Sequence, residues 1–70
     1  MEALRKLLKD LGSDAKLAAE YERNPDEVMK ARGLPEDARA AMKGKDVEAV
    51  RKLAGLGEVH LSNSTIKCHD

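Results

Sequence analysis

Four side chains that could take part in metal or nucleophile chemistry lie near the C-terminal end of the chain: His60, Cys68, His69 and Asp70. A closed zinc site needs four ligands in a tetrahedron, usually from paired Cys-x₂₋₄-Cys or His-x₃₋₅-His spacings. Here Cys68 and His69 are adjacent and the rest of the ligand shell is missing. A Cys–His nucleophile pair also needs a third group to orient the base. We therefore expect no metal site, no catalytic residue and no cofactor bound by this chain alone, so the chain is not expected to be an enzyme.

Other candidate residues are explained more simply by helix structure. Five carboxylates fall where helices are expected to begin, and there they stabilise the positive end of the helix dipole; they are Asp26, Glu27, Glu36, Asp37 and Asp46. Met29 and Met42 lie on apolar helical faces, which favours core packing. Tyr21 is the single aromatic residue of the chain. It could in principle be a catalytic acid, but its place on an apolar face favours a core ring with its hydroxyl at the rim.

The first two helices follow from apolar spacing. Leu4, Leu7, Leu8 and Leu11 recur at i, i+3, i+4 and i+7, which is one stripe of a helix. We expect this helix to end at Gly12 and Ser13 to cap the next one, whose apolar face carries Leu17, Ala18 and Tyr21. The second helix must end by Asn24, because the residue before Pro25 is disfavoured in the α region.

Three further short helices are expected between residues 24 and 54. In the third, Asn24 and Pro25 suit the N-cap and first helical positions, and Gly33 can take the left-handed conformation that lets Leu34 pack back over the last turn. The fourth helix runs from Pro35 to Gly44, and Asp46 caps a fifth that ends at Gly55. None reaches the roughly 12–15 residues at which an isolated helix becomes marginally stable. The sequence therefore predicts an all-α fold, a small bundle of about five short helices that pack on one another.

Size and composition limit the remaining possibilities. Seventy residues are enough for one small domain. Without Phe or Trp, its core must consist of Leu, Val, Met and Ala and is thin, so we expect a partner to add stability. A net charge of zero argues against nucleic-acid binding. No apolar run approaches the roughly 20 residues needed to span a bilayer, so no membrane association is expected. The single cysteine excludes an internal disulfide and fits a cytoplasmic location.

The last stretch differs from the helices. Residues 58–70 show no 3.6-residue stripe and mix β-branched residues with Ser and Asn. We expect no contribution to the core from this stretch and interpret it as an extended, mobile tail. The expected organisation is a helical binding domain at 1–55 and a tail at 56–70.

A set of motif residues in the bundle resembles a known family. The pattern comprises Leu11, Gly12, Asp14, Leu17, Tyr21, Asn24, Pro25, Val28, Met29, Ala31, Gly33, Leu34 and Asp46. It is similar to the alpha subunit of extradiol ring-cleaving dioxygenases and, more closely, to the leader domain of borosin precursor peptides of the split type. The resemblance covers roughly residues 8–53. Two positions depart from the pattern: Pro35 replaces a Thr cap, and Lys45 separates a Gly–Asp pair.

The resemblance implies a ribosomally made precursor whose tail is modified by another protein. In such systems the helical leader docks on a separate S-adenosylmethionine-dependent methyltransferase, which N-methylates backbone amides of the tail; two precursors are expected on an enzyme dimer. The implied modification candidates are Leu61, Asn63, Thr65 and Ile66. The implied partner-binding residues are Leu11, Tyr21, Asn24, Pro25, Val28, Met29 and Leu34. This function requires that residues beyond Gly57 can enter an enzyme cleft.

Two alternatives remain open. The chain could be a small noncatalytic helical subunit of a dioxygenase-like enzyme, which would favour a structured C-terminal extension over a cavity. It could also be a precursor for other tailoring chemistry, with Cys68, Ser62, Ser64 or Thr65 as sites of dehydration or cyclisation. Intact mass after co-expression distinguishes these alternatives.

Overall fold

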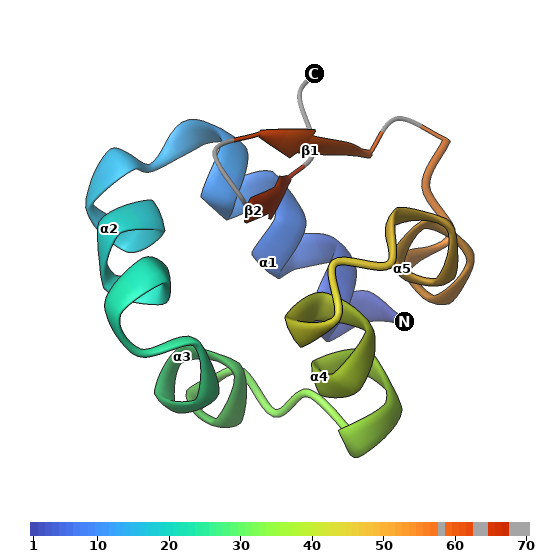
Figure 1. Ribbon diagram of the computed structural model, residues 1–70, viewed down its shortest axis with the longest axis horizontal. Helices are drawn as coiled ribbons and strands as arrows, with labels where there is room; N and C mark the ends of the chain where they lie inside the picture. Colours follow the sequence, from blue (N-terminus) through green and yellow to red (C-terminus); the bar gives the residue numbers. More distant parts are fainter. Residues whose placement is uncertain (58, 63–64, 68–70) are drawn as a thin grey trace.

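The computed structural model describes residues 1–57, 59–62 and 65–67. In this part of the chain five helices are followed by a short antiparallel hairpin (Figure 1). The elements are α1 (Glu2–Ser13), α2 (Ala15–Arg23), α3 (Pro25–Ala31), α4 (Glu36–Lys43), α5 (Val47–Ala54), β1 (His60–Ser62) and β2 (Thr65–Lys67). The predicted fold class, a small all-α bundle followed by an extended C-terminal stretch, is confirmed.

Helix α1 is the centre of the bundle. It contacts both α2 and α5, and α3 and α4 close the ring of helices on the far side (Figure 1). Leu4, Leu7, Leu8 and Leu11 are each at most 2% exposed, so the predicted leucine stripe forms the middle of the core. The start of α1 also holds the end of α5: the amino terminus donates to the carbonyl of Leu53, and the Arg5 guanidinium donates to that of Gly55, both at 3.1 Å.

The boundary between α1 and α2 lies one to two residues later than predicted. Gly12 is inside α1, which ends at Ser13. Asp14, not Ser13, caps α2, and its carboxylate accepts hydrogen bonds from the backbone N–H groups of Lys16 and Leu17 at 3.0 and 3.2 Å. A carboxylate at this position also interacts favourably with the helix dipole. The Ser13 hydroxyl donates instead to the carbonyl of Lys9 in the preceding turn.

The end of α3 has the predicted cap. Gly33 has φ +73°, its N–H donates to the carbonyl of Lys30, and the N–H of Leu34 donates to that of Met29. These two bonds define a Schellman motif, and the Leu34 side chain is 5% exposed. At the other end of α3, Pro25 occupies the first turn, while the Asn24 side chain makes no capping hydrogen bond.

The junction of α4 and α5 repeats this motif with a lysine in the left-handed position. Gly44 has φ −80°, whereas Lys45 has φ +55°. The N–H of Lys45 donates to the carbonyl of Met42, and that of Asp46 to the carbonyl of Ala41. The chain therefore turns at Lys45, one residue after the glycine that was expected to stop the helix. Asp46 then caps α5, as predicted, by accepting from the N–H of Ala49 at 3.1 Å.

Replacing Lys45 with glycine is expected to stabilise the protein. A side chain in the left-handed region costs about 1–2 kcal/mol, part of which is returned by the greater freedom of glycine in the unfolded chain. We expect the free energy of unfolding of Lys45→Gly, measured by urea denaturation, to rise by about 0.5–1 kcal/mol. Lys45→Ala removes the same charge but keeps the Cβ atom, and should give no such increase. Equal stability of the two variants would contradict the backbone cause.

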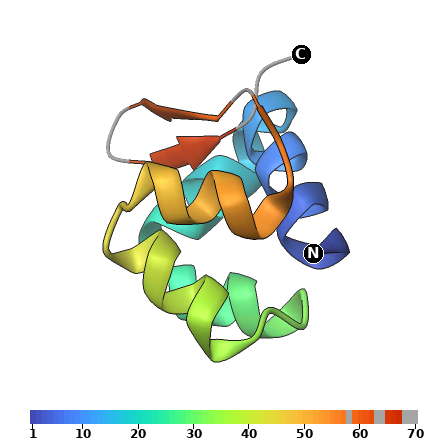
Figure 2. The same ribbon diagram turned by 90° about the vertical axis from the view of Figure 1, so that its right-hand side faces the viewer.

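The expectation that the tail makes no contribution to the core was wrong for Val59 and Ile66. Strands β1 and β2 pair with Leu61 opposite Ile66, and β2 packs against α1. Val59 is 8% exposed, Thr65 is 4% and Ile66 is 1%. Figure 2 shows the hairpin at one end of the bundle. The apolar side chains of Val59 and Ile66 extend a core that has few large residues of its own, and their burial favours the packed hairpin.

Candidate functional site

The candidate modification residues differ sharply in accessibility. Leu61 on β1 is 49% exposed, whereas its cross-strand neighbour Ile66 on β2 is 1% exposed. Thr65 is buried next to Ile66. Asn63 lies outside the described residues. Of the described candidates, therefore, Leu61 alone presents its side chain to an approaching protein.

Strand β2 is enclosed on two sides. Successive side chains of a strand point to opposite faces, yet Thr65 and Ile66 are both buried. Ile66 belongs to the hydrophobic core, while Thr65 lines two hollows, one beside α2 and α4 and one beside the α1–α2 turn. We call the surface that contacts Val59, Thr65 and Ile66 the β2 seat. An enzyme reaches the β2 side chains only after the strand has left this seat.

Most of the predicted partner-binding residues are in the core. Five of these residues are at most 6% exposed, so a partner cannot touch their side chains directly in this structure; they are Leu11, Tyr21, Val28, Met29 and Leu34. Asn24 is exposed and Pro25 is half-buried, both at the α2–α3 turn. A partner that binds this face therefore contacts Asn24 and Pro25 first, and the binding role of the whole set stays a prediction.

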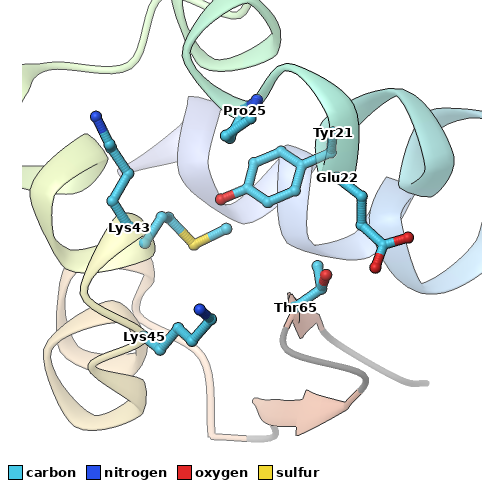
Figure 3. A pocket seen from close by; sticks show the side chains of 7 residues that line it. Tyr21, Glu22, Pro25, Lys43, Lys45 and Thr65 are labelled. Carbon is cyan, nitrogen blue, oxygen red and sulfur yellow. The ribbon is translucent and has the colours of Figure 1, made fainter.

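A pocket of about 320 Å³ lies between α2, the start of α3, the α4–α5 junction and β2 (Figure 3). Its lining combines polar and apolar side chains from all of these elements: Tyr21, Glu22, Pro25, Met42, Lys43, Lys45 and Thr65. Tyr21 and Met42 are the predicted core residues of this set, and no sequence pattern connects them with the two lysines, with Glu22 or with Thr65. These residues are up to 44 positions apart (65 − 21), so no local pattern could have grouped them.

Tyr21 forms the buried wall of this pocket. Its side chain is 6% exposed, and its hydroxyl donates to the sulfur of Met29 at 4.0 Å. Burial raises the pKa of Tyr21 to about 12, with a further contribution from the nearby negative charge of Asp26. The phenol therefore stays protonated at neutral pH and acts as a hydrogen-bond donor. The predicted core ring is confirmed.

The raised pKa of Tyr21 predicts a shifted phenol titration. The folded protein should form phenolate with a midpoint near pH 12, against about 10 for the urea-unfolded chain. Because the unfolded state loses this proton first, stability falls as the pH rises from about 10 towards 12. The phenolate absorption band reports Tyr21 alone, since the chain has one Tyr and no Trp. Asp26→Asn should lower the folded midpoint without abolishing the shift, and identical midpoints for folded and unfolded protein would contradict the burial.

The charged residues around the pocket have different partners. The Lys43 ammonium pairs at 3.1 Å with Asp26, which does not line the pocket. Lys45 forms no ion pair with any residue that the structure describes. Glu22 is exposed at the rim. Outside the pocket lining, Asp10 accepts a 2.8 Å hydrogen bond from Arg32, which lowers the pKa of that carboxyl and joins α1 to the end of α3.

The described residues form neither a candidate metal site nor a helix that could span a membrane. Within residues 1–57, 59–62 and 65–67, no three His, Cys, Asp or Glu side chains gather as a metal site. Of the candidate ligands, Cys68, His69 and Asp70 lie outside these ranges. The backbone of His60 is described but its side chain is not. No helix in the described part of the chain is both long and apolar enough to cross a membrane.

Comparison with known proteins found no matching family model, no matching curated protein and no matching solved structure. The borosin resemblance therefore rests on the motif residues of the sequence.

Proposed function

We propose that this chain is the precursor peptide of a split borosin system. In this proposal, residues 1–55 dock on a separate S-adenosylmethionine-dependent methyltransferase, and backbone amides in residues 56–70 are its substrate. The observation that carries the proposal is the division of the chain at Gly55, which has φ +71° and ends the last helix. All five described helices lie before this point, and the hairpin after it presents Leu61 to solvent.

The hairpin must leave the β2 seat before Thr65 or Ile66 can react. Burial of Val59 and Ile66 stabilises the seated state by about 1.5–3 kcal/mol for each side chain. Ordering the segment opposes this by about 1–2 kcal/mol for each residue held in place. A two-stranded hairpin with three residues in each strand adds little stability of its own. The seat therefore holds the tail weakly enough for a tightly binding enzyme to displace it.

Docking of the helices explains how an enzyme could modify a tail that carries no obvious recognition motif. A tethered substrate reaches an effective concentration of the order of mM near the active site, so side-chain recognition is not needed. The partner supplies the base and the methyl donor. The amide loses its proton to the base, the nitrogen–methyl bond forms, and S-adenosylhomocysteine leaves as the methyl–sulfur bond breaks. This chain contributes the amide nitrogen alone, and it acts in the cytoplasm where its cysteine stays reduced.

Co-expression with a matched methyltransferase tests the proposal. Intact mass should increase in steps of one methylene, and fragmentation should place every step between residues 58 and 70. The same chain expressed without the enzyme is the control. Two precursors per enzyme dimer are expected by native mass spectrometry. An unchanged mass with enzyme and methyl donor present would refute the proposal, and a loss of water would instead indicate a precursor for other tailoring chemistry.

One observation favours a second candidate, a small noncatalytic subunit of a dioxygenase-like enzyme. That function requires a structured C-terminal extension over a cavity, and here Thr65 of β2 lines the Tyr21 pocket. A subunit of this kind would keep its mass unchanged in the co-expression experiment and would co-purify with a larger catalytic chain. The resemblance of the motif to borosin leaders is closer, so the precursor role remains the proposed function.

A further inference from the structure

The Tyr21 pocket contains a buried donor without a strong acceptor. The hydroxyl of Tyr21 is directed into the space that the other labelled side chains surround (Figure 3). Among the described residues its one hydrogen-bond partner is the thioether of Met29 at 4.0 Å, and a thioether is a weak acceptor. A buried polar group gains much from a better partner. An oxygen that enters the pocket could therefore accept the phenol hydrogen in place of the sulfur.

The same pocket contains a lysine held in a strained backbone conformation. Lys45 has φ +55°, and strain of this kind in folded proteins often lies at functional sites. Figure 3 shows its side chain on the same side of the Tyr21 ring as Thr65. The Lys43 ammonium, in contrast, pairs with Asp26. Among the described residues no carboxylate pairs with Lys45. The pocket therefore offers one cation without an ion-pair partner beside one buried hydroxyl donor, with the exposed carboxylate of Glu22 at its rim.

The remaining lining limits the charge and shape of a ligand. Pro25 and Met42 provide apolar contacts, which suit a short hydrocarbon stem. Glu22 at the rim repels a second negative charge, so a phosphate dianion is a poor fit. A single carboxylate matches the one cation without an ion-pair partner and can also accept from the phenol.

We propose that this pocket binds a monocarboxylate on a short apolar stem, with its oxygens accepting from the Tyr21 hydroxyl and the Lys45 ammonium. The stem lies against Pro25 and Met42. The carboxylate comes either from a free aliphatic acid or from the C-terminus of a peptide, since both present the same group. The site does not require the precursor role, because all but one of its lining residues belong to the helical domain.

A fluorescence titration with hexanoate tests the site. Tyrosine emission reports Tyr21 alone in a chain without Trp. We expect a saturable change with hexanoate and none with hexanamide, which keeps the stem and lacks the charge. No saturable response, or equal responses to the acid and the amide, would overturn the proposal.

Variants at Lys45 separate binding from folding. Lys45→Gly is expected to be more stable than the parent chain, so weaker binding by this variant cannot be attributed to unfolding. We expect Lys45→Gly and Lys45→Ala each to bind hexanoate about tenfold more weakly, as expected for loss of a charge-assisted hydrogen bond. Lys52→Ala, at an exposed position of α5, should bind like the parent. Glu22→Gln should bind about two- to threefold more tightly. Unchanged affinity in Lys45→Gly would overturn the assignment.

Two peptide-like probes distinguish the sources of the carboxylate. Acetyl-leucine carries the carboxylate of a peptide C-terminus, and acetyl-leucinamide is its neutral control. Tighter binding of acetyl-leucine than of hexanoate would identify a peptide C-terminus as the ligand, and the reverse order a free aliphatic acid. Both orders support the site, whereas binding of acetyl-leucinamide as tight as that of acetyl-leucine would contradict it.

Discussion

Replacing Ile66 with alanine is expected to lower the free energy of unfolding by about 2 kcal/mol, the low end of the range for truncating a fully buried aliphatic side chain, because release of the weakly held hairpin limits the loss. Ile66 is 1% exposed and belongs to the core formed with α1, so the truncation leaves a cavity under β2. Urea denaturation followed by circular dichroism measures the change. A chain of this size has a total stability of only several kcal/mol, so this single substitution removes a large share of it.

Leu61→Ala is the matched control for this prediction. Leu61 is the cross-strand partner of Ile66 but is 49% exposed, so its truncation should change stability by less than about 0.5 kcal/mol. If both variants unfold like the parent, β2 does not occupy its seat in solution and the tail is free. If Ile66→Ala alone is destabilised, β2 occupies its seat in solution, and any enzyme that modifies the tail must first displace β2.

The same pair of variants bears on the proposed function. Loss of the Ile66 side chain weakens the seated state, so the tail is available to the methyltransferase for more of the time. The number of methyl groups added in a fixed time should therefore increase in Ile66→Ala under conditions where the helices stay folded, and should not change in Leu61→Ala unless that residue is itself recognised. Slower methylation of both variants would indicate direct recognition of these side chains by the enzyme.

Replacing Gly33 with valine is expected to destabilise the helical domain by about 2 kcal/mol, because a β-branched side chain resists the left-handed conformation. Gly33 has φ +73°, and a Cβ atom built there meets nothing within 4 Å. The cost is therefore one of backbone strain and not of steric contact. Loss of the Schellman motif also releases Leu34 from the core. Urea denaturation measures the stability, and a pull-down with the methyltransferase measures docking, which we expect to be lost or greatly weakened.

Gly57→Val provides the matched control for Gly33→Val. Gly57 likewise has open space around its Cβ position, but its φ is not in the left-handed region. The same substitution should therefore leave both stability and docking close to those of the parent chain. Unimpaired docking by Gly33→Val would show that the third helix is not needed for the partner contact, and equal effects of the two substitutions would contradict the backbone explanation.

The sequence by itself determined the helices of this protein. The stripe from Leu4 to Leu11, the glycine cap at Gly33 and the aspartate cap at Asp46 all depend on residues within one or two turns of each other, and the structure confirms each of them. The predicted helix ends differ from the structure by one or two residues, at places where either of two adjacent residues could serve as the cap or the turn residue. Asp14 caps α2 in place of Ser13, and Lys45 takes the left-handed turn that was expected at Gly44.

The tertiary structure alone decided the fate of the C-terminal stretch and the existence of the pocket. Ile66 is buried because α1 passes beneath it, more than fifty positions away in the chain, and nothing in the local sequence indicates that contact. Tyr21, Lys45 and Thr65 meet for the same reason. Hydrogen bonds within a helix join residues four apart and can be predicted locally, whereas burial depends on which distant surfaces the packed helices bring together.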